Sequence, residues 1–370
     1  MDYEAYKALY LHIPFCVQKC SYCDFESAAT SREDNCIDEY LDSLILDIRR
    51  ASREGSLGAI QTVYIGGGTP THIGHARLSK LLYTLSLSMH LEPEVECTIE
   101  ANPESVDEAT IRDIWALGVN RISMGVQSFD DAVLKILGRP HDSALAKQAV
   151  RIAQTRFENI SIDLMCGIPG QSIESFASSV AAAIELGVKH ISVYPLTIEN
   201  GTPFTTCVEN GLMEYPDDDT AALHMQKAAE LLEAAGYERY EVASYAKPGF
   251  QSRHNTAYWT GIPYLGLGKG ATSMRQTPEF RERVKDGVVE ERLSADEIIA
   301  EDLMLKMRMS RGISLEDVQA ASFVFDKLPT LIGDLMAQGL ISLHEERYRP
   351  TERGWLCGNQ LYAGFLDLCE

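Results

Sequence analysis

The chain carries three thiols within eight residues, in the run Cys16-Val-Gln-Lys-Cys20-Ser-Tyr-Cys23. The run follows an apolar stretch, residues 9–13, that is typical of a β-strand. Cysteine thiolates hold iron–sulfur clusters, and a cubane cluster normally takes four of them. Three thiolates leave one iron without a protein ligand, so a small molecule with an amine and a carboxylate could bind that iron. The run therefore predicts a cluster and, beside it, a ligand-binding site.

Two other uses of closely spaced cysteines fit this run less well. Zinc sites usually pair cysteines as C-x2-C and complete a tetrahedron with a fourth Cys or His. Here the spacing is C-x3-C-x2-C, with only His12 or Asp24 nearby. Disulfides need an oxidising compartment, and no basic region followed by an apolar run precedes Cys16. Because the chain has nine cysteines, a disulfide framework would also leave one unpaired. We favour the cluster and keep zinc as the alternative.

Composition predicts a soluble protein of two domains. The chain has 370 residues, 45% of them hydrophobic. No uncharged apolar run approaches the roughly 18 residues that a membrane span requires. Acidic residues outnumber basic ones by 54 to 33, which gives a formal net charge of -21. This charge repels a phosphate backbone, so we expect no nucleic-acid partner. Free thiols without a secretion signal predict a cytoplasmic location.

Short β-branched apolar runs alternate with amphipathic helical stretches. The expected strands are residues 9–13, 62–65, 96–100, 121–126, 161–165 and 190–196. Expected helices cover residues 38–50 and 77–87, each with its leucines on one face. A third helix is expected to open at Ser105, with Glu108 completing a capping box, and to stop at Gly118. Six strand–helix units in succession predict an α/β fold with a parallel sheet.

Glycines and polar residues recur where these strands end. The second strand runs into Gly66-Gly-Gly-Thr-Pro70, where missing side chains would let a ligand approach the backbone. Glu100 and Asp163 are single carboxylates that emerge from apolar strands and could accept hydrogen bonds from amine or ribose groups. The alternative is that each pairs with Arg121 or Arg139. Because parallel barrels carry their chemistry at the carboxyl ends of the strands, we expect these residues to lie beside the cysteines.

At these positions the chain resembles a known superfamily. Cys16-x3-Cys20-x-Tyr22-Cys23 is similar to the signature of radical S-adenosylmethionine (SAM) proteins. Four further motifs narrow the resemblance to the oxygen-independent coproporphyrinogen III oxidase-like group: Tyr10-Leu-His-Ile-Pro-Phe-Cys16, Gly66-Gly-Gly-Thr-Pro-Thr71, Ser123-Met-Gly-Val-Gln-Ser-Phe129 and Ile162-Asp-Leu-Met-Cys-Gly-Ile-Pro-Gly-Gln171. The resemblance covers nearly the whole chain. It implies a partial parallel (β/α)6 barrel of the TIM type.

The resemblance also implies cofactors and their ligands. Cys16, Cys20 and Cys23 would hold a [4Fe-4S] cluster, and S-adenosylmethionine would bind the fourth iron through its amino and carboxylate groups. The residues that match S-adenosylmethionine contacts are Tyr10, Tyr22, Gly67, Gly68, Thr69, Glu100, Gln127, Arg139, Asp163 and Thr197. An electron from the reduced cluster would cleave the sulfonium to methionine and a 5'-deoxyadenosyl radical, while the barrel orients the cofactor and excludes water.

Two branches of this group differ at positions that this chain contains. The coproporphyrinogen III oxidase branch has a longer amino-terminal arm and a further cysteine after the third, where this chain has Phe25. The chain instead carries His254-Asn-Thr-Ala-Tyr-Trp259, which is similar to the heme-binding motif of the heme chaperone branch, the HemW proteins. A neutral imidazole is a natural axial ligand of heme iron, and Tyr258 and Trp259 offer flat faces to a macrocycle. We therefore expect His254 to bind heme.

Three segments are expected. They are a barrel core over residues 1–235, a connecting segment with the histidine motif over residues 236–292, and a winged-helix-like α+β domain over residues 293–370. In the last segment, helical stretches at residues 296–307, 315–320 and 328–338 precede a two-stranded wing at residues 339–344 and 347–350. Winged helices often bind DNA, but the basic residues here are few, so we expect a structural or partner-docking role.

These features together predict a heme chaperone. It would bind heme, the cluster and S-adenosylmethionine, receive electrons from a donor, and pass heme to an acceptor protein. Whether the chain is also an enzyme stays open. The alternatives are an oxygen-independent coproporphyrinogen III oxidase and a radical enzyme directed to nucleic acid, which the net charge disfavours.

Overall fold

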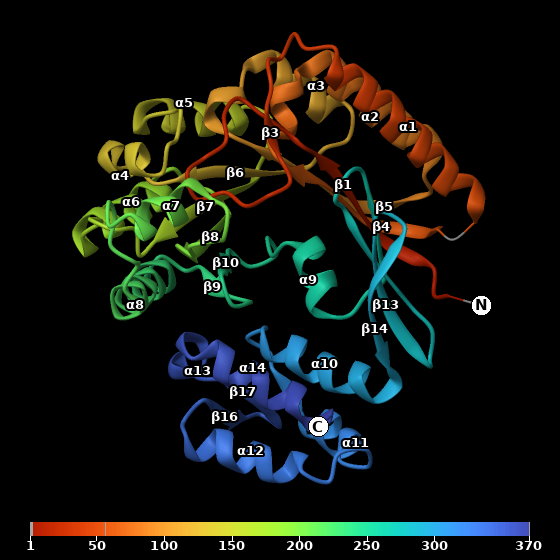
Figure 1. Cartoon of the computed structure of the whole chain (residues 1–370), viewed down its shortest axis with the longest axis vertical. Coiled ribbons are helices and arrows are strands. Elements are labelled where there is room, and N and C mark those ends of the chain that lie inside the picture. Colours follow the sequence, from red (N-terminus) through yellow and green to blue (C-terminus); the bar gives the residue numbers. More distant parts are fainter. Residues whose placement is uncertain (1–2, 56, 370) are drawn as a thin grey trace.

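The computed structural model describes residues 3–55 and 57–369, and a twelve-stranded sheet dominates it (Figure 1). Its six central strands are parallel and coincide with the six predicted ones. They are β1 (Tyr6–Ile13), β4 (Leu57–Gly67), β5 (Leu91–Ala101), β6 (Arg121–Gln127), β7 (Asn159–Cys166) and β8 (His190–Pro195). The predicted α/β fold with a partial parallel barrel is confirmed.

Helices cover the outer face of the parallel strands (Figure 1). The helices of this region are α1 (Cys36–Glu54), α2 (His75–Ser88), α3 (Glu108–Ala116), α4 (Asp131–Ile136), α5 (Ser143–Gln154), α6 (Ile173–Glu185), α7 (Pro203–Glu209) and α8 (Asp218–Ala234). In α1, Leu41, Leu44 and Ile48 are buried in the core, as the amphipathic pattern predicts. Gly118 and Gly187 follow α3 and α6 with φ of 96° and 70°, the left-handed conformation that glycine adopts at helix ends.

The third helix begins later than predicted. Asp107 caps α3, because its side chain accepts a hydrogen bond from the backbone N–H of Thr110. Ser105 instead ends a short 3-10 turn, η2 (Pro103–Ser105), where it forms a capping box with Asn102. The prediction of Ser105 as the cap of the helix was wrong, because the Asn-Pro step before it favours a separate turn.

The inner face of the parallel strands is polar. Side chains alternate between the two faces along each strand, and the outward set, such as Ile65, Ile99 and Ile122, forms the core with the helices. The inward set is Thr62, Tyr64, Thr98, Glu100, Arg121, Ser123, Ser161, Asp163, His190 and Ser192. Branched apolar side chains usually fill the interior of parallel barrels. A polar interior therefore indicates that this space serves a site rather than the core.

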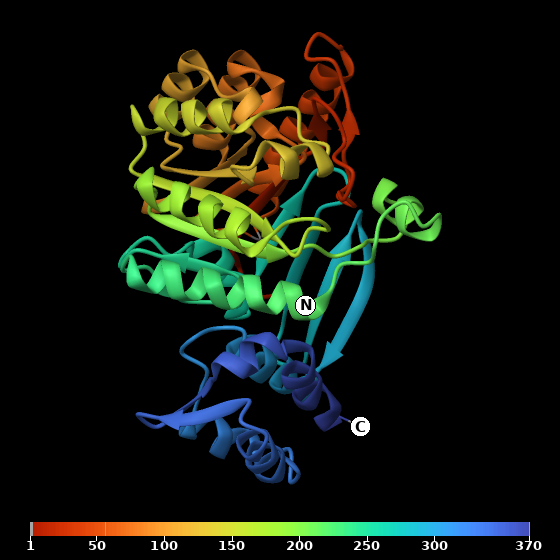
Figure 2. The same cartoon turned by 90° about the vertical axis from the view of Figure 1, so that its left-hand side faces the viewer.

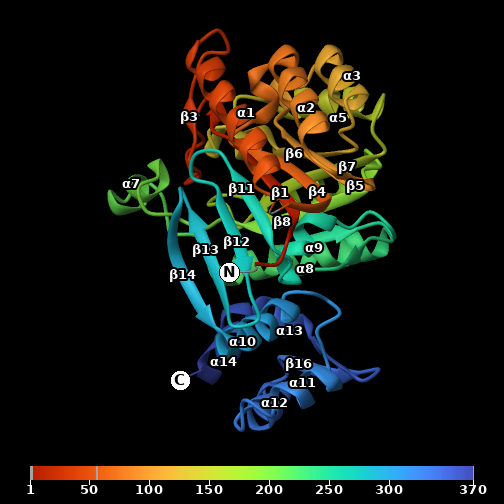
Figure 3. The same cartoon turned by 90° about the vertical axis from the view of Figure 1, so that its right-hand side faces the viewer.

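Residues 236–292 do more than connect two domains, because they add six strands to the sheet. These are β9 (Glu238–Arg239), β10 (Ser244–Ala246), β11 (Tyr264–Leu267), β12 (Thr272–Gln276), β13 (Phe280–Lys285) and β14 (Val288–Ser294). The full order is β14-β13-β12-β11-β1-β4-β5-β6-β7-β8-β10-β9. Figure 3 shows β12, β13 and β14 reaching from the barrel toward the C-terminal domain. The same segment contains α9 (Arg253–Trp259), which carries the histidine motif.

The C-terminal domain lies beneath the barrel around its own hydrophobic core (Figure 2). Its elements are α10 (Ala295–Met307), β15 (Ile313–Ser314), α11 (Leu315–Ala321), α12 (Leu328–Ala337), β16 (Ile341–His344), β17 (Arg347–Pro350), α13 (Glu352–Leu356), α14 (Gly358–Leu366) and η3 (Asp367–Cys369). The predicted helices and the two strands of the wing are confirmed, and β15 adds a third strand beside β17. No helix in the described part of the chain is long and apolar enough to cross a bilayer.

Candidate functional site

The three predicted cluster cysteines lie on a loop at the carboxyl ends of the parallel strands. The loop leaves β2 (Phe15–Cys16), which pairs with β3 (Ala28–Ala29). Cys20 is buried, and Cys16 and Cys23 are half-buried. All three line one cavity together with most of the predicted S-adenosylmethionine residues, namely Tyr22, Gly67, Gly68, Glu100, Gln127, Arg139 and Asp163. The structure thus brings these distant parts of the sequence together.

Glycines are required where β4 meets the cysteine loop. A Cβ at Gly68 would lie 2.9 Å from the backbone N and O of Phe15 and 3.0 Å from Sγ of Cys16. Gly67 has a φ of 113°, and a Cβ there would lie 2.5 Å from the ring of His12. Any larger residue at either position would therefore displace the loop from the strand.

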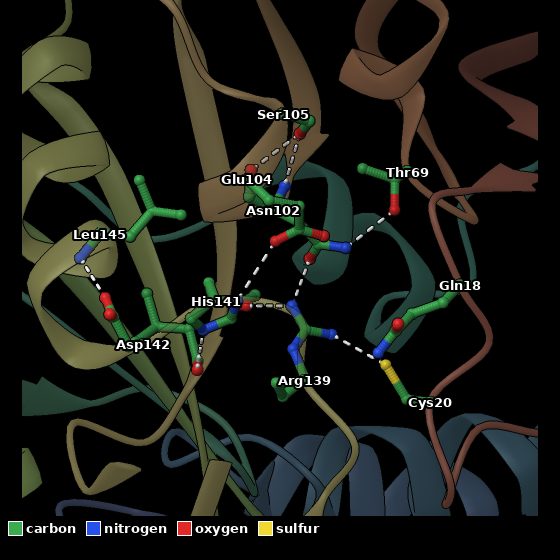
Figure 4. A network of polar contacts seen from close by, with 12 residues as sticks. Gln18, Cys20, Thr69, Asn102, Glu104, Ser105, Arg139, His141, Asp142 and Leu145 are labelled. Carbon is green, nitrogen blue, oxygen red and sulfur yellow. Dashed lines mark hydrogen bonds and ion pairs between the residues drawn. The ribbon is translucent and has the colours of Figure 1, made fainter. Parts of the chain in front are cut away.

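A polar network joins two of the cysteines, and Figure 4 shows its centre around Arg139. Arg139 donates from Nη1 to Sγ of Cys20 at 3.2 Å and from Nη2 to Oδ1 of Asn102 at 2.8 Å. Asn102 donates to Oγ1 of Thr69 at 2.8 Å, and this hydroxyl donates to Sγ of Cys16 at 3.5 Å. Burial raises the pKa of Cys16, and the hydrogen bond from Thr69 acts in the opposite direction. Sequence reasoning missed Asn102, and the only signal was its place at the end of the third strand.

Glu100 reaches the cavity from β5 and is held by two donors. The hydroxyl of Tyr64 donates to Oε1 at 2.7 Å, and the backbone N–H of Gly67 donates to Oε2 at 2.9 Å. Burial raises the pKa of Glu100 to about 7, although both hydrogen bonds oppose that shift. The carboxyl group is thus oriented and ionises near neutral pH, where it can accept a hydrogen bond from a cationic ligand.

Asp163 faces the same cavity from β7. The hydroxyl of Ser123 donates to its Oδ2 at 3.4 Å. Burial raises the pKa of Asp163 as well, and the positive charge of Arg121 acts in the opposite direction. Among the described residues, neither Asp163 nor Glu100 forms an ion pair with Arg121 or Arg139. The structure therefore does not show the simple buried pair that stood as the alternative to a ligand role.

Gln127 combines a place in the cavity wall with a strained backbone. Its φ is 67°, a value that residues with a Cβ rarely adopt. The register between β6 and β7 shifts between Gly125 and Gln127, which marks a bulge. Strain of this kind persists at functional sites, where the surrounding structure fixes it. The location agrees with the expected ligand role, which stays a prediction.

Besides Thr69, which bonds Cys16, three predicted ligand residues lie outside the cavity wall. Tyr10 is on β1, with its ring centroid 6.2 Å from that of Tyr64 and its hydroxyl 2.9 Å from Nδ1 of His12. Thr197 is exposed on the loop after β8. The contacts of Tyr10 and Thr197 with S-adenosylmethionine stay predictions. The third residue, His254, lies at the other end of the barrel.

His254 is buried on α9, and both of its ring nitrogens have partners. Nδ1 lies 2.8 Å from Oγ1 of Thr62, and Nε2 lies 3.0 Å from the hydroxyl of Tyr258. Burial lowers the pKa of His254 to about 3, so the imidazole is neutral, which is the form that binds iron. Iron can reach the ring only after one of these hydrogen bonds is broken.

Tyr64 lies between the two ends of the barrel interior. Its ring stacks on that of His254 with centroids 5.0 Å apart, and its hydroxyl reaches Glu100. On the same strand, Thr62 bonds His254 and Gly67 lines the cysteine cavity. Five residues separate them, which is about 16 Å at the rise of a β-strand. The cysteines and the histidine thus occupy opposite ends of one polar interior.

The arrangement of donors fits an iron–sulfur cluster better than a single metal ion. The thiolates of a cluster bind different irons, whereas zinc gathers three or four ligands around one point. Within residues 3–55 and 57–369, no three Cys, His, Asp or Glu side chains converge on one ion position. Three separate sulfurs, two of them beside hydrogen-bond donors, match the first pattern.

The cysteine loop lines part of the cavity. Its enclosed volume is about 120 Å³, below the roughly 300–1,000 Å³ that is usual for small-molecule sites. A nucleoside ligand therefore has to extend beyond this volume, and Phe25, which also lines the cavity, is 62% exposed. Phe25, at the position of the further cysteine of the oxidase branch, can therefore contact a ligand that extends from the cavity.

Known proteins resemble this chain over most of its length. The radical SAM superfamily matches residues 10–183, and the HemN C-terminal domain matches residues 293–357. The protein named heme chaperone HemW of Lactococcus lactis is 33% identical, with 96% of this chain and 96% of that protein covered. The HemW protein of Escherichia coli is 36% identical, with 97% of this chain and 98% of that protein covered.

One solved structure shares the fold over nearly the whole chain. It is the coproporphyrinogen III oxidase HemN of Escherichia coli, described as a radical SAM enzyme. The TM-score is 0.82, with 98% of this chain and 90% of that chain covered at 23% identity. At this identity the likeness concerns the fold alone.

Proposed function

The chain belongs to the radical SAM superfamily and, within it, to the group of proteins named heme chaperone HemW, and from this premise we propose that it binds heme and transfers it to an acceptor protein. We propose further that it holds a [4Fe-4S] cluster and S-adenosylmethionine. The observation that carries the proposal is the pairing of a three-cysteine cavity with a neutral imidazole at the other end of the same interior.

At the end of the interior that faces the cysteine loop, Cys16, Cys20 and Cys23 would hold the cluster. The cavity beside them would take S-adenosylmethionine. When bound, a reduced cluster supplies the electron that can cleave a sulfonium bond. The chain's own part is positional. Arg139 fixes one sulfur at 3.2 Å, and Glu100 presents a carboxyl group that two hydrogen bonds orient.

At the opposite end, His254 can bind heme iron once one of its two hydrogen bonds breaks, and a shift of α9 would break the one with Thr62, since Tyr258 lies on α9 itself. The helix has only seven residues. The carboxylate of Glu96 holds it by accepting from its first two backbone N–H groups, both at 3.0 Å. Once displaced, α9 would present the imidazole together with the flat rings of Tyr258 and Trp259 to a macrocycle.

Two partners and a location complete the proposal. A cluster that is to be reduced needs an electron donor, and a chaperone needs an acceptor for its heme. We propose the cytoplasm as the location, because reducing conditions keep the cluster cysteines free of disulfides.

Hemin titration of the anaerobically reconstituted protein tests heme binding at His254. We expect a Soret band that weakens in His254→Ala and is unchanged in His344→Ala, which removes an exposed histidine of the C-terminal domain. Transfer is then followed by mixing the hemin-loaded protein with apomyoglobin as the probe. A Soret band of the same intensity in His254→Ala would reject this residue as the ligand.

The cluster and the oxidase alternative are tested on the same preparation. Iron and sulfide analysis should detect a cluster in the wild type and much less in Cys20→Ser, whereas zinc without sulfide would restore the zinc alternative. With coproporphyrinogen III under reducing conditions we expect no release of carbon dioxide. Consumption of the porphyrinogen without hemin binding would assign the chain to the oxidase function instead.

A further inference from the structure

The barrel interior contains a buried cation that has no direct ion-pair partner among the described residues. Arg121, the first residue of β6, is 1% exposed. Among the described residues, its guanidinium takes part in no hydrogen bond or ion pair. Its neighbours in register, Thr98 on β5 and Asn159 on β7, also hold enclosed side-chain atoms without partners. A charge buried in this way costs several kcal/mol unless opposite charges compensate it.

Two carboxyl groups of the cysteine cavity supply the opposite charge. Glu100 is two residues beyond Thr98, and its partner in register is Ser123. Ser123 is two residues beyond Arg121 and donates to Asp163. Asp163 is in register with Gly125, so Arg121 lies one layer below Glu100 and two layers below Asp163. Its positive charge lowers the pKa of each, against burial, which has the larger effect and raises it.

Other ionisable groups face Arg121, Glu100 and Asp163 from the surrounding elements. They are Tyr10, Tyr64, Arg139, His190, Tyr194, Tyr240, Glu241, His254 and Tyr258. Burial keeps the tyrosines and both histidines neutral near pH 7. Arg139 is engaged with Cys20 and Asn102 at the cysteine loop. The charge of Arg139 also lowers the pKa of Asp163, whereas Arg121 acts on both Glu100 and Asp163.

We propose that Arg121 is a positioning residue for S-adenosylmethionine, which allows Glu100 and Asp163 to be ionised together and leaves this part of the cavity with one net negative charge. S-Adenosylmethionine carries a sulfonium, an ammonium and a carboxylate, hence one net positive charge. S-Adenosylhomocysteine lacks the sulfonium and has no net charge. Two carboxylates with one guanidinium therefore complement the first ligand better than the second. The inference rests on the proposed binding of S-adenosylmethionine.

Calorimetric binding of the two nucleosides to the cluster-reconstituted protein tests this role. Arg121→Gln and Arg121→Met remove the charge, and Arg121→Lys keeps it. Arg121→Met leaves no unpaired polar atom, a change that buried sites often tolerate. At about pH 6 we expect both neutral variants to bind S-adenosylmethionine roughly tenfold more weakly, because each unit of raised carboxyl pKa corresponds to a factor of ten.

The pH dependence separates an electrostatic role from a packing role. At about pH 9 the carboxyl groups ionise without Arg121, so the affinity of the neutral variants should return to the wild-type level or exceed it. Arg121→Lys should follow the wild type at every pH. In the neutral variants the affinity for S-adenosylhomocysteine should change less than about threefold, because this ligand has no net charge for the cavity to match.

Two results would overturn the inference. One is a loss of affinity in the neutral variants that is equally large at both pH values or for both nucleosides. The other is an affinity in the neutral variants that depends on pH as in the wild type. Iron content and thermal unfolding of each variant verify that cluster and fold are intact. A wild-type protein that binds hemin but neither nucleoside would instead remove the proposed S-adenosylmethionine site itself.

Discussion

Glu100 places an ionisable carboxyl group where burial opposes its charge. Its pKa is about 7 in the folded chain, against an ordinary value of 4.5. Because the folded pKa is raised, ionisation penalises the native state progressively as the pH rises from 4.5 to about 7. The full penalty, about 3 kcal/mol, persists above that range. We expect Glu100→Gln to gain stability over the wild type between about pH 5 and about pH 8, measured by denaturant unfolding without cofactors.

Comparing the free energies of unfolding at about pH 5 and about pH 8 makes this prediction specific. Glutamine can accept only one of the two hydrogen bonds that Glu100 accepts, so the variant carries a fixed cost at every pH. The difference between the two pH values cancels that cost. Glu209→Gln, on an exposed position, serves as the control and should show no such change. Parallel pH curves for Glu100→Gln and the wild type would contradict the prediction.

Asn102 links the guanidinium of Arg139 to the hydroxyl of Thr69, and through it to Cys16. Asn102→Ala leaves both neighbours with a missing partner, which costs about 1–3 kcal/mol for a bond to a charged group. We expect the reconstituted cluster to be lost to a chelator roughly tenfold faster, followed by its visible absorbance. Asn159→Ala, at the far end of the interior, should leave the rate unchanged. Equal rates in all three proteins would contradict this prediction.

Sequence patterns predicted the residues of the site better than their partners. The cysteines, Glu100 and Asp163 could be predicted because they follow strand ends, and parallel strands bring those ends to one rim. Asn102 and Arg121 could not be assigned in the same way. Their roles depend on which side chains meet across three strands, and spacing along the chain carries no such information. From the sequence, Arg121 is expected only as a direct partner of a carboxylate, and among the described residues it forms no ion pair.

Among the elements, α9 shows how a short helix can be kept in a position that it would not hold alone. Isolated helices of this length are unstable in water, so its seven residues depend on contacts with the barrel. Glu96 provides two of them by accepting from the backbone N–H groups of Arg253 and His254. The carboxylate of Glu96 thus holds the first turn of α9 together with the Ser252 cap.

Glu96→Gln should loosen α9 without unfolding the barrel. The amide can accept from only one of the two N–H groups and places its own donor against the other, a cost of about 1–3 kcal/mol. We expect faster backbone hydrogen exchange in α9 and little change in β5 and β6. Glu94→Gln is the matched control, since Glu94 is exposed two residues earlier on the same strand. Unchanged exchange in α9 would show that other contacts hold it.

The elements that sequence patterns missed are those that depend on distant pairing. The six parallel strands are apolar on their outward face and stand out in the sequence. By contrast, β13 and β14 carry arginines and glutamates, and they are strands because they pair with each other and with β12. Strand propensity depends on such context. The segment that contains them therefore looked like a connection, although it extends the sheet at both edges.

Across the whole molecule, the barrel and the C-terminal domain meet at α9. The guanidinium carbon of Arg308, which caps α10, lies 4.4 Å from the ring centroid of Trp259 and 5.0 Å from that of Tyr362 on α14. Trp259 is the last residue of the histidine motif, so the C-terminal domain contacts the helix that carries the proposed heme ligand. Cation–π contacts of this kind contribute about 1–2 kcal/mol when desolvated.

Although Arg308 lies in the C-terminal domain, Arg308→Ala should therefore change the affinity for heme at α9. If only the open form of α9 binds hemin, the apparent affinity is the intrinsic affinity multiplied by the fraction that is open. Weakening the closed form by about 1 kcal/mol should raise that affinity about fivefold. Hemin titration measures the effect, and Arg292→Ala, which removes a similar contact with Phe280 away from α9, should have none.

The same reasoning predicts how Glu96→Gln and Arg308→Ala combine. Both act on one opening of α9, so their effects on hemin affinity should add as free energies only while the closed form still dominates. Once α9 is mostly open, the second change can no longer raise the open fraction. The hemin affinity of the double variant should then equal the intrinsic affinity of His254. In a His254→Ala background neither change should raise hemin binding. If either variant weakens hemin binding instead, the closed α9 is the form that binds heme, and the hydrogen bond of Nε2 with Tyr258 would have to break while the one with Thr62 persists.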